Sequence, residues 1–501
     1  MATGPVLACA AATFLVLLAV AGRYGYHRDE LYFLEASKHL AWGYVDQPPL
    51  SVALAGLARA LFGESLVGLR VFPAFADGGV VVLTALVTRE LGGGRFPQTL
   101  AALAVGLSPF LIAGHLAGPT IYDILAWVGV SLLVLRIIRT GRTRLWLAVG
   151  VVGGAALLNK ETIAFLIVAL VLGFLANRQG RVLLNPWLAG GVALALAIWS
   201  PTLVWQSQHG WAMLEMSRNL QQEHSGLGYA LKFPVILILL PGWWIAPVWI
   251  AGLVAFLREE RFRPYGAFGL AYLVLAVLLL VLIPDRPYYI AGLIPILVAA
   301  GSIVAEGGVG GVRRFLSERR PGRRLVWRSR TGALIWVTAM GVLGLPLALP
   351  ILPASALATI PLQQINYNLG EEIGWPHMVR QIASVYLSLP PAKRATAVIL
   401  TSNYGEAGAV DRYGPALGLP HAFSGHDSFW WWGPPPEPRG TTIAVGFDRG
   451  SLRPYFRHVE VAGRLHNGFG VDDDEEGQPI WLCTAMRRTW PQIWPAFKHY
   501  G

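Results

Sequence analysis

The chain has 501 residues, of which 54% are hydrophobic and only 14% are charged, and its mean hydropathy is +0.50. Because soluble domains carry about 25% charged residues, this composition excludes an ordinary soluble protein and predicts a polytopic membrane protein. The net charge of +11 does not indicate a nucleic-acid partner, because the arginines gather in short loops between apolar segments. The only two cysteines, Cys9 and Cys483, lie near opposite ends, and no cysteine–histidine metal spacing is present.

Eleven apolar segments approach the length of about 20 residues that a spanning helix needs. They lie at residues 5–22, 71–88, 97–113, 120–139, 144–159, 161–177, 185–204, 231–257, 264–283, 287–305 and 331–350. The first segment has a signal-peptide-like end, but its leader MATGP lacks Lys and Arg, so we expect a first spanning helix. Residues 48–62 are too short to span and predict a helix along the membrane surface.

The charged loops predict the topology. If the helices alternate, five arginine-containing loops fall on one side, at residues 89–95, 136–144, 178–181, 258–263 and 306–330. The positive-inside rule places that side in the cytoplasm. The outer side then receives residues 26–50, 115–123, 159–161, 205–230, 284–289 and everything after 350. We therefore expect a multi-pass plasma-membrane protein whose unusual polar residues collect on the outer face.

The composition changes after residue 350. Apolar runs shorten to strand length at residues 397–400, 442–447 and 479–483, while residues 375–389 have helical spacing. This pattern predicts a transmembrane domain at residues 1–350 and a small extracytoplasmic α/β domain at residues 351–501. The acidic run at residues 472–476 is expected to be a solvated loop.

Acidic residues follow the first apolar segment, where a bilayer makes charge costly unless it faces water, a partner or a substrate. Neighbours on a helix point about 100° apart, so Asp29 and Glu30 would have different roles, one accepting a proton and the other orienting a neighbour. Alternatively, Asp29 caps a helix that begins at Glu30. Asp46 precedes a rigid Pro pair. It therefore lies either with Asp29 and Glu30 beside a cleft at the membrane surface, or in a simple turn before the surface helix.

Three further outer loops carry charges. Asp123, at the outer end of a predicted span, is either functional or paired with an arginine. Lys160 and Arg286 either pair with their neighbours Glu161 and Asp285 or capture a phosphate. Taken together, these loops predict a site for an anionic, lipid-linked substrate.

The motifs RDELYF, VDQPPL, LLNK and DRPYYIAGLIP resemble, in order and spacing, the dolichyl-phosphate-mannose–protein mannosyltransferase family, glycosyltransferase family 39. The aminoarabinose lipid A transferases belong to the same group. The likeness covers roughly residues 20–305. It implies a GT-C fold, that is, an all-α polytopic membrane protein, here with about eleven transmembrane helices. It also implies inverting transfer of one sugar from a polyprenyl-phosphate donor to a hydroxyl of a protein, lipid or glycan.

The resemblance also implies roles for particular residues. The catalytic acids would be Asp29, Glu30 and Asp123. Substrate would be bound by Asp46, Gln47, Lys160, Arg286, Tyr288 and Tyr289, of which the last four lie near the lipid phosphate. Gln47 departs from the family pattern, because relatives often have His or Lys before the Pro pair.

The C-terminal segments NYGEAGAVDRYGP and SGHDSFWWWGP resemble an outer domain of some bacterial members, to which the resemblance assigns no role. The tryptophans at residues 430–432 either stack on sugar or are core or interfacial aromatics. No cofactor is required; a divalent metal is compatible with the acids but is not demanded by them.

The predicted mechanism makes Asp29 the general base and has Lys160 and Arg286 stabilise the departing lipid phosphate, with the polyprenyl tail between helices. The competing class is a transporter or flippase, because charges within membranes also mark transport pathways. Such proteins often contain repeated halves, which are absent here, and the charges lie at helix ends. A scaffolding protein would not explain acids and bases in separate loops.

Overall fold

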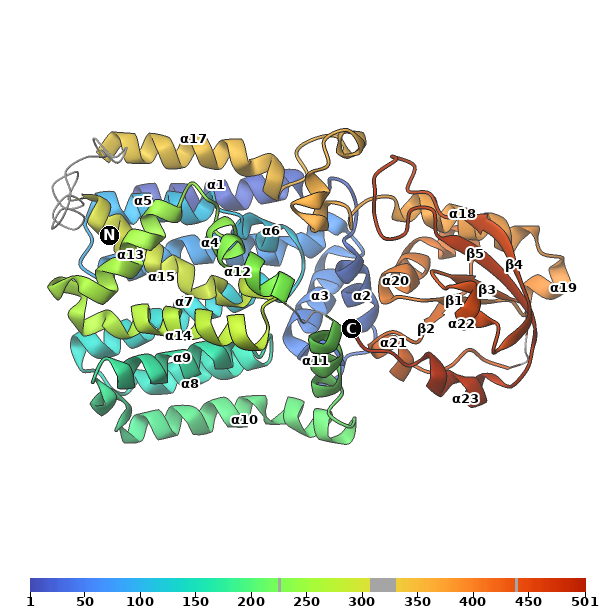
Figure 1. Ribbon diagram of the computed structural model, residues 1–501, viewed down its shortest axis with the longest axis horizontal. Helices are drawn as coiled ribbons and strands as arrows, with labels where there is room; N and C mark the ends of the chain where they lie inside the picture. Colours follow the sequence, from blue (N-terminus) through green and yellow to red (C-terminus); the bar gives the residue numbers. More distant parts are fainter. Residues whose placement is uncertain (224–226, 307–329, 438–439) are drawn as a thin grey trace.

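The computed structural model describes residues 1–223, 227–306, 330–437 and 440–501. A long helical bundle occupies one part of the molecule and a sheet-containing C-terminal domain the other (Figure 1). The arginine-rich segment expected at residues 306–330 lies almost wholly outside the described residues.

The helical part begins with α1 (Thr3–Val20), which packs on α4 (Leu66–Glu90) and α5 (Arg95–Gly106). Between α1 and α4 lie two shorter helices, α2 (Arg28–Ala36) and α3 (Pro49–Phe62). The bundle continues with α6 (Phe110–His115), α7 (Thr120–Thr140), α8 (Leu145–Leu157), α9 (Ile163–Ala176), α10 (Pro186–Gln208), α11 (Ala212–Glu223), α12 (Leu227–Leu239), α13 (Ala246–Arg258), α14 (Gly266–Leu282), α15 (Ile294–Glu306) and α17 (Arg330–Ala348). Short 3-10 helices lie at Gly180–Leu183, Glu260–Tyr265 and Pro287–Leu293.

Seven helices within the described ranges are long and apolar enough to cross a membrane. The predicted total of eleven spans is not confirmed. The span expected at 97–113 is broken between α5 and α6, and the one at 231–257 is broken between α12 and α13. Pro109 and Pro241 lie at these breaks, where a proline cannot donate the backbone hydrogen bond that a continuous helix needs. The spans expected at 144–159 and 161–177 form α8 and α9, of 13 and 14 residues.

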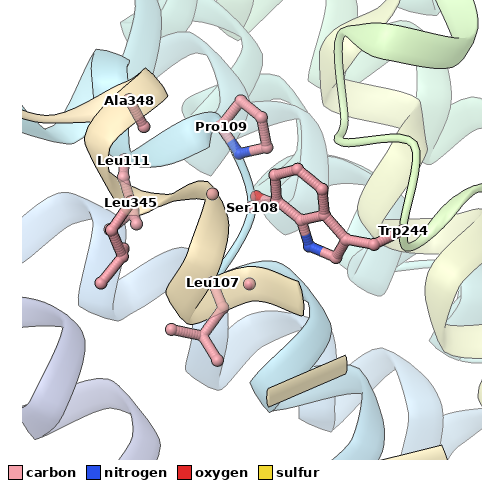
Figure 2. Close-up of a pocket in the computed structure, with 9 residues that line it drawn as sticks. Leu107, Ser108, Pro109, Leu111, Trp244, Leu345 and Ala348 are labelled. Atoms are coloured by element: carbon pink, nitrogen blue, oxygen red, sulfur yellow. The ribbon is translucent and has the colours of Figure 1, made fainter. Parts of the chain in front are cut away.

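The two helix breaks pack against each other. Figure 2 shows Trp244, from the break between α12 and α13, beside Pro109 and Ser108 at the break between α5 and α6. A Cβ atom at Gly344 of α17 would lie 2.5 Å from the Trp244 ring. A glycine is therefore needed for α17 to approach this closely.

The described arginine loops meet at the end of the bundle that lies away from the sheet (Figure 1). Glu90 pairs with Arg136 at 2.8 Å and with Arg139 at 2.6 Å, while Arg261 donates to the Gly92 carbonyl at 3.1 Å. The predicted gathering of basic loops at one end is therefore seen for these loops. The assignment of that end to the cytoplasm stays a prediction.

The C-terminal domain contains a five-stranded sheet with the order β2-β1-β3-β5-β4. Its strands are β1 (Val398–Thr401), β2 (Ala422–Ser424), β3 (Thr442–Val445), β4 (Phe456–Arg464) and β5 (Pro479–Met486). Strands β2, β1 and β3 are parallel, whereas β5 is antiparallel to both β3 and β4. The runs at 397–400, 442–447 and 479–483 are confirmed as strands; β2 has only three residues and β4 is largely exposed, so neither produced an apolar run.

Helices surround the sheet. The predicted helix at 375–389 is confirmed as α18 (Trp375–Ser388). The other helices are α19 (Pro391–Arg394), α20 (Tyr404–Tyr413), α21 (Ser428–Trp431), α22 (Arg449–Leu452) and α23 (Trp490–Ile493). Short 3-10 helices occur at Ala354–Ala358, Leu362–Gln364, Tyr367–Leu369, Pro415–Leu417 and Trp494–Phe497.

The acidic run at 472–476 is not the simple solvated loop that was expected. Glu475 is buried, and burial raises its pKa to about 9. Asp473 accepts hydrogen bonds from the backbone N–H groups of Glu475 and Glu476, at 3.2 and 2.8 Å. Asp474 lies 3.5 Å from Arg28 of the N-terminal part. The run is thus an ordered turn at the junction between the two parts of the chain.

Helix α2 lies between the bundle and the C-terminal domain, where it packs against α3 and α20 (Figure 1). Two glycines allow α20 to approach. A Cβ atom at Gly408 would lie 2.9 Å from Leu31, and one at Gly405 would lie 2.8 Å from the Arg28 Cβ. The C-terminal domain therefore rests directly on the RDELYF segment.

A buried ion-pair network anchors α2 to the bundle. Arg70 of α4 is 1% exposed and forms two hydrogen bonds with Glu30, from Nε at 2.9 Å and from Nη2 at 2.6 Å. It also donates to Glu372 at 3.1 Å and lies 2.8 Å from His115 of α6. Bidentate pairing and several partners are what a buried arginine needs to offset its desolvation. The network joins α2, α4, α6 and the segment before α18.

Replacing Glu30 with Gln should lower the free energy of unfolding by about 3–5 kcal/mol, because the buried Arg70 charge loses its main partner. Denaturant or thermal unfolding of the detergent-purified protein measures this loss. The matched control is Glu64→Gln, which removes an exposed ion pair with Arg412 at 3.3 Å and should cost less than about 1 kcal/mol. Equal losses in the two variants would contradict the anchoring role.

The topology prediction is tested at two exposed positions, one at each end of the molecule. In a chain whose Cys9 and Cys483 have been replaced, Arg142→Cys should react with a membrane-impermeant maleimide only from the cytoplasmic side. Lys393→Cys should react only from the outside. Labelling of both positions from the same side of sealed vesicles would overturn this orientation.

Candidate active site

The first turn of α2 sets the direction of its two acidic side chains. His27 is the N-cap residue: its Nδ1 accepts from the Asp29 backbone N–H at 3.1 Å, and Glu30 accepts from the His27 N–H at 2.9 Å. The alternative in which Asp29 caps this helix is therefore wrong. Glu30 also accepts from Arg70 and from the Ala117 N–H at 2.8 Å. With its oxygens occupied and 1% of its surface exposed, Glu30 is a structural residue, which corrects its candidacy as a catalytic acid.

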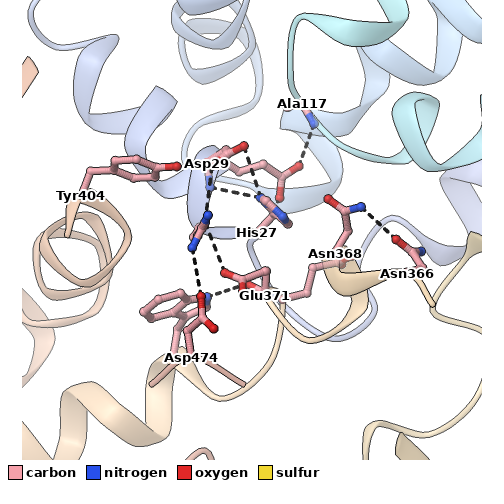
Figure 3. A network of polar contacts seen from close by, with 12 residues as sticks. His27, Asp29, Ala117, Asn366, Asn368, Glu371, Tyr404 and Asp474 are labelled. Atoms are coloured by element: carbon pink, nitrogen blue, oxygen red, sulfur yellow. Dashed lines mark hydrogen bonds and ion pairs between the residues drawn. The ribbon is translucent and has the colours of Figure 1, made fainter. Parts of the chain in front are cut away.

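Asp29 faces away from this network. Its side chain is 45% exposed, and Oδ1 accepts a hydrogen bond from the hydroxyl of Tyr404 in α20 at 2.8 Å (Figure 3). Within the described part of the chain, Tyr404 is the only hydrogen-bond donor to this carboxylate, because Arg28 Nε lies 3.9 Å from Oδ1 and His27 Nδ1 lies 3.9 Å from Oδ2. Oδ2 thus accepts no hydrogen bond from a described residue. The role of Asp29 as the general base stays a prediction.

Arg28 ties the same turn to the C-terminal part of the chain. Its Nε lies 3.3 Å from Glu371, and its Nη1 lies 3.5 Å from Asp474. The guanidinium also lies 5.9 Å from the centre of the Tyr404 ring. Arg28 is therefore a structural link across the domain junction.

Asp46 shares its environment with Asp29. Tyr32 donates to Asp46 Oδ1 at 2.7 Å. Burial raises the pKa of Asp46 to about 7; the Asp29 charge contributes to the rise, and the Tyr32 hydrogen bond opposes it. The Tyr32 hydrogen bond fixes Asp46 near Asp29, and its expected part in substrate binding stays a prediction. Next to it, Gln47 is 3% exposed, and its buried Nε2 has no partner among the described residues.

Asp427, in the SGHDSFWWWG segment, is a third carboxyl group in this region that sequence reasoning missed. Burial and then the Asp46 charge hold the pKa of Asp427 well above its usual value. Asp427 has a positive φ of 46°, which is uncommon outside glycine. The next residue, Ser428, accepts from the Val45 N–H at 3.2 Å. The SGHDS turn therefore packs on the loop that carries Asp46.

Asp123 is buried and hydrogen-bonded on both oxygens. It accepts from Trp127 Nε1 at 2.9 Å and from Thr162 Oγ1 at 2.7 Å. It is not paired with an arginine in the described structure, so that alternative is wrong. Asp123 ties α7 to the loop that carries Lys160, and its expected part in catalysis stays a prediction.

Lys160, Arg286 and two tyrosines form one group. Lys160 Nζ lies 5.3 Å from the Tyr288 ring centre and 5.1 Å from that of Tyr289. Arg286 donates to the Tyr289 hydroxyl at 2.8 Å and pairs with Asp285 at 3.3 Å. The alternative in which Lys160 pairs with Glu161 is not seen. Among the described residues, no carboxylate oxygen lies within 4.0 Å of Lys160 Nζ, the distance that defines an ion pair. Two cations from separate loops thus flank one tyrosine pair.

The three consecutive tryptophans after the SGHDS turn are held by protein contacts. Trp430 Nε1 donates to the Trp494 carbonyl at 3.1 Å, and Trp431 Nε1 donates to the Tyr500 hydroxyl at 2.8 Å. Trp432 stacks on His39 with ring centres 4.5 Å apart. These contacts support the interpretation of the three residues as packing aromatics.

One group of side chains in the described structure has metal-ligand types within reach of each other. Ligand atoms of Glu35, Asp411 and His421 all lie within 4.8 Å of one another. Glu35 already pairs with Lys38 at 2.7 Å, and Asp411 with His421 at 2.9 Å, so these charges are balanced within the protein. The group lies at the opposite end of α2 from Asp29 and does not form part of the candidate active site.

Sequence comparison finds the same family as the motifs. Residues 46–205 match the family described as dolichyl-phosphate-mannose-protein mannosyltransferase. An undecaprenyl phosphate-alpha-4-amino-4-deoxy-L-arabinose arabinosyl transferase of Pseudomonas fluorescens Pf-5 is 26% identical over 55% of this chain and 52% of its own length. A second such transferase from that strain is 32% identical over 26% of this chain and 23% of its own length. The chain thus spans about half the length of the first of these relatives.

Structure comparison extends the likeness to nearly the whole chain. ArnT from Cupriavidus metallidurans in the apo state matches with a TM-score of 0.59 and 16% identity, over 95% of this chain and 96% of that one. ArnT bound to undecaprenyl phosphate matches with a TM-score of 0.57 and 16% identity, over 94% and 97% of the two chains. The predicted resemblance is therefore confirmed: this multi-pass membrane protein has the GT-C fold of ArnT and is similar to the mannosyltransferase family across residues 46–205.

Proposed function

We propose that this chain transfers a sugar from a polyprenyl-phosphate donor to an acceptor hydroxyl, at the end of the bundle that the C-terminal domain covers. We place that end outside the cytoplasm. The observation that carries the proposal is Asp29, a carboxylate with one free oxygen, at the same end as the cations Lys160 and Arg286. The names of the arabinosyl transferase relatives, and the ArnT complex with undecaprenyl phosphate, agree with this class of donor.

The donor phosphate binds between Lys160 and Arg286. Both cations lie against the Tyr289 ring, with charged centres 5.1 and 5.8 Å from its centroid. Lys160 has no acidic partner within 4.0 Å among the described side chains, so its charge is available to an anion. A lysine supplies a point charge and an arginine a planar pair of donors. Together they stabilise the charge that develops on the departing phosphate.

The polyprenyl tail lies in an apolar groove of about 1030 Å³ between α1, α4, α7 and α8. Small residues at Gly78, Gly79 and Gly129 leave the space open, and the lining is almost entirely apolar. The groove reaches Asn159, the residue before Lys160. A lipid in this groove would therefore place its phosphate near Lys160.

The reaction is a single displacement with inversion. The acceptor hydroxyl attacks the anomeric carbon from the face opposite the phosphate. The new carbon–oxygen bond forms as the bond to the phosphate oxygen breaks, and the hydroxyl proton passes to Asp29 Oδ2. The lipid phosphate leaves with the bonding electron pair and is held by Lys160 and Arg286. Asp46, whose charge interacts with that of Asp29, and Gln47, whose buried Nε2 has no partner among the described residues, bind polar groups of the substrate in this proposal. No covalent enzyme intermediate is needed.

Asp29→Asn should transfer sugar at least about 100-fold more slowly than the native chain, because general-base assistance contributes 10²–10⁴-fold in rate. Binding of the lipid-linked donor and the unfolding temperature should be unchanged, because the amide keeps the size of the side chain. Turnover is measured with purified protein and a panel of polyprenyl-phosphate sugars.

Asp123→Asn is the comparison for this experiment. We expect a smaller loss of sugar-transfer rate in this variant, because it weakens the hydrogen bond with Thr162 and does not remove the base. An equal or larger loss in Asp123→Asn, with near-native turnover by Asp29→Asn, would remove Asp29 from the mechanism. The absence of transfer from every donor by the native chain would contradict the proposed function itself.

A further inference from the structure

The first turn of α20 is built to hold its first residue, Tyr404, in a fixed position. Helix α20 follows the carboxyl end of β1, and its start is a capping box: Asn403 accepts from the Glu406 N–H at 2.8 Å, and Glu406 accepts from the Asn403 N–H at 3.2 Å. Glu406 also accepts from the Ser402 N–H at 3.0 Å. These bonds fix the backbone of α20 where it meets α2.

Three neighbours confine the ring of Tyr404. Tyr32 of α2 lies against it, with ring centroids 4.9 Å apart. His426, in the SGHDS turn, stacks on it at 4.7 Å and lies 3.3 Å from the Tyr404 backbone N–H, which donates to its Nδ1. Arg28 lies 5.9 Å from the ring centre. The phenol is therefore held by residues of both the N-terminal loop and the C-terminal domain.

The hydroxyl of Tyr404 reaches Asp29 Oδ1 at 2.8 Å, across 375 residues of sequence (Figure 3). Burial and the Asp29 charge hold the pKa of Tyr404 well above its usual value, so the hydroxyl is a donor at all physiological pH values. This hydrogen bond fixes the orientation of the carboxylate and leaves Oδ2 without a hydrogen-bond donor among the described residues.

We propose that Tyr404 is a positioning residue that holds Asp29 in the orientation of a general base, so that the C-terminal domain is part of the active site. This inference rests on the proposed function. It assigns a role to the NYGEAG and SGHDS segments: the first supplies Tyr404, and the second packs His426 against its ring. In the described structure no group of the membrane helices makes an equivalent contact with Asp29.

The test compares Tyr404→Phe with Tyr413→Phe. Tyr413 lies on the same helix and contacts Tyr26, at a ring distance of 6.4 Å, and it makes no contact with Asp29. Because hydrogen bonds to charged groups are worth more than neutral ones, kcat should fall about ten-fold or more in Tyr404→Phe while KM for the donor is unchanged. The unfolding temperature should be unchanged, because the two side chains differ only in the hydroxyl group. Tyr413→Phe should match the native chain in kcat, KM and unfolding temperature.

The outcomes separate this inference from the proposed function. An inactive Asp29→Asn beside a Tyr404→Phe variant with native kcat would overturn the role of Tyr404 and leave the proposed function intact. A lower kcat with a raised KM for the donor or a lowered unfolding temperature would show a merely structural role and would also overturn it. A lower kcat in Tyr404→Phe, at an unchanged KM and an unchanged unfolding temperature, supports it.

Discussion

The buried pairing of Arg70 with Glu30 is the interaction on which the candidate active site depends. Removing these two charges from water is costly, and the cost is offset only because Glu30 accepts four hydrogen bonds and Arg70 pairs on both edges of its guanidinium. The pairing fixes the rotation of α2 about its axis. Adjacent helical side chains point about 100° apart, so directing Glu30 inward turns Asp29 outward, toward Tyr404 of the C-terminal domain. One acid of the pair is buried in the ion-pair network, and the other is the one that we propose as the base.

The proposed site joins two parts with different electrostatic character. The carboxyl groups of Asp29, Asp46 and Asp427 come from the loops around α2 and from the C-terminal domain, and burial raises the pKa of Asp46 to about 7. The cations Lys160 and Arg286 come from loops between membrane helices and lie around one tyrosine pair. A sugar donor with an anionic lipid phosphate needs both: acids near the sugar and the acceptor, and cations near the leaving group. The lipid chain is proposed to lie in the apolar groove between the helices.

Composition and motif order were sufficient to predict the fold class, the resemblance and the gathering of polar loops at one end. Interactions between distant segments were not predictable in this way. Arg70 stands next to the apolar run at 71–88, and nothing in its own segment indicates that its partners are Glu30 and Glu372, 40 and 302 residues away. Tyr404 was likewise found only because α20 packs on α2, and Asp427 only because the SGHDS turn packs on the loop that carries Asp46. The breaks in the spans at 97–113 and 231–257 did have a visible signal, in Pro109 and Pro241, which outweighs the apolar composition around them.

The most direct test of this account is a structure of the protein with a polyprenyl phosphate bound. The account predicts that a phosphate oxygen lies about 3 Å from both Lys160 Nζ and the Arg286 guanidinium, the distance of a charge-assisted hydrogen bond. The isoprenoid chain should follow the groove between α1, α4, α7 and α8. The Asp29 carboxylate should face the side of the phosphate group that the two cations leave open. A phosphate bound away from both cations, or a lipid chain outside this groove, would contradict the proposed active site.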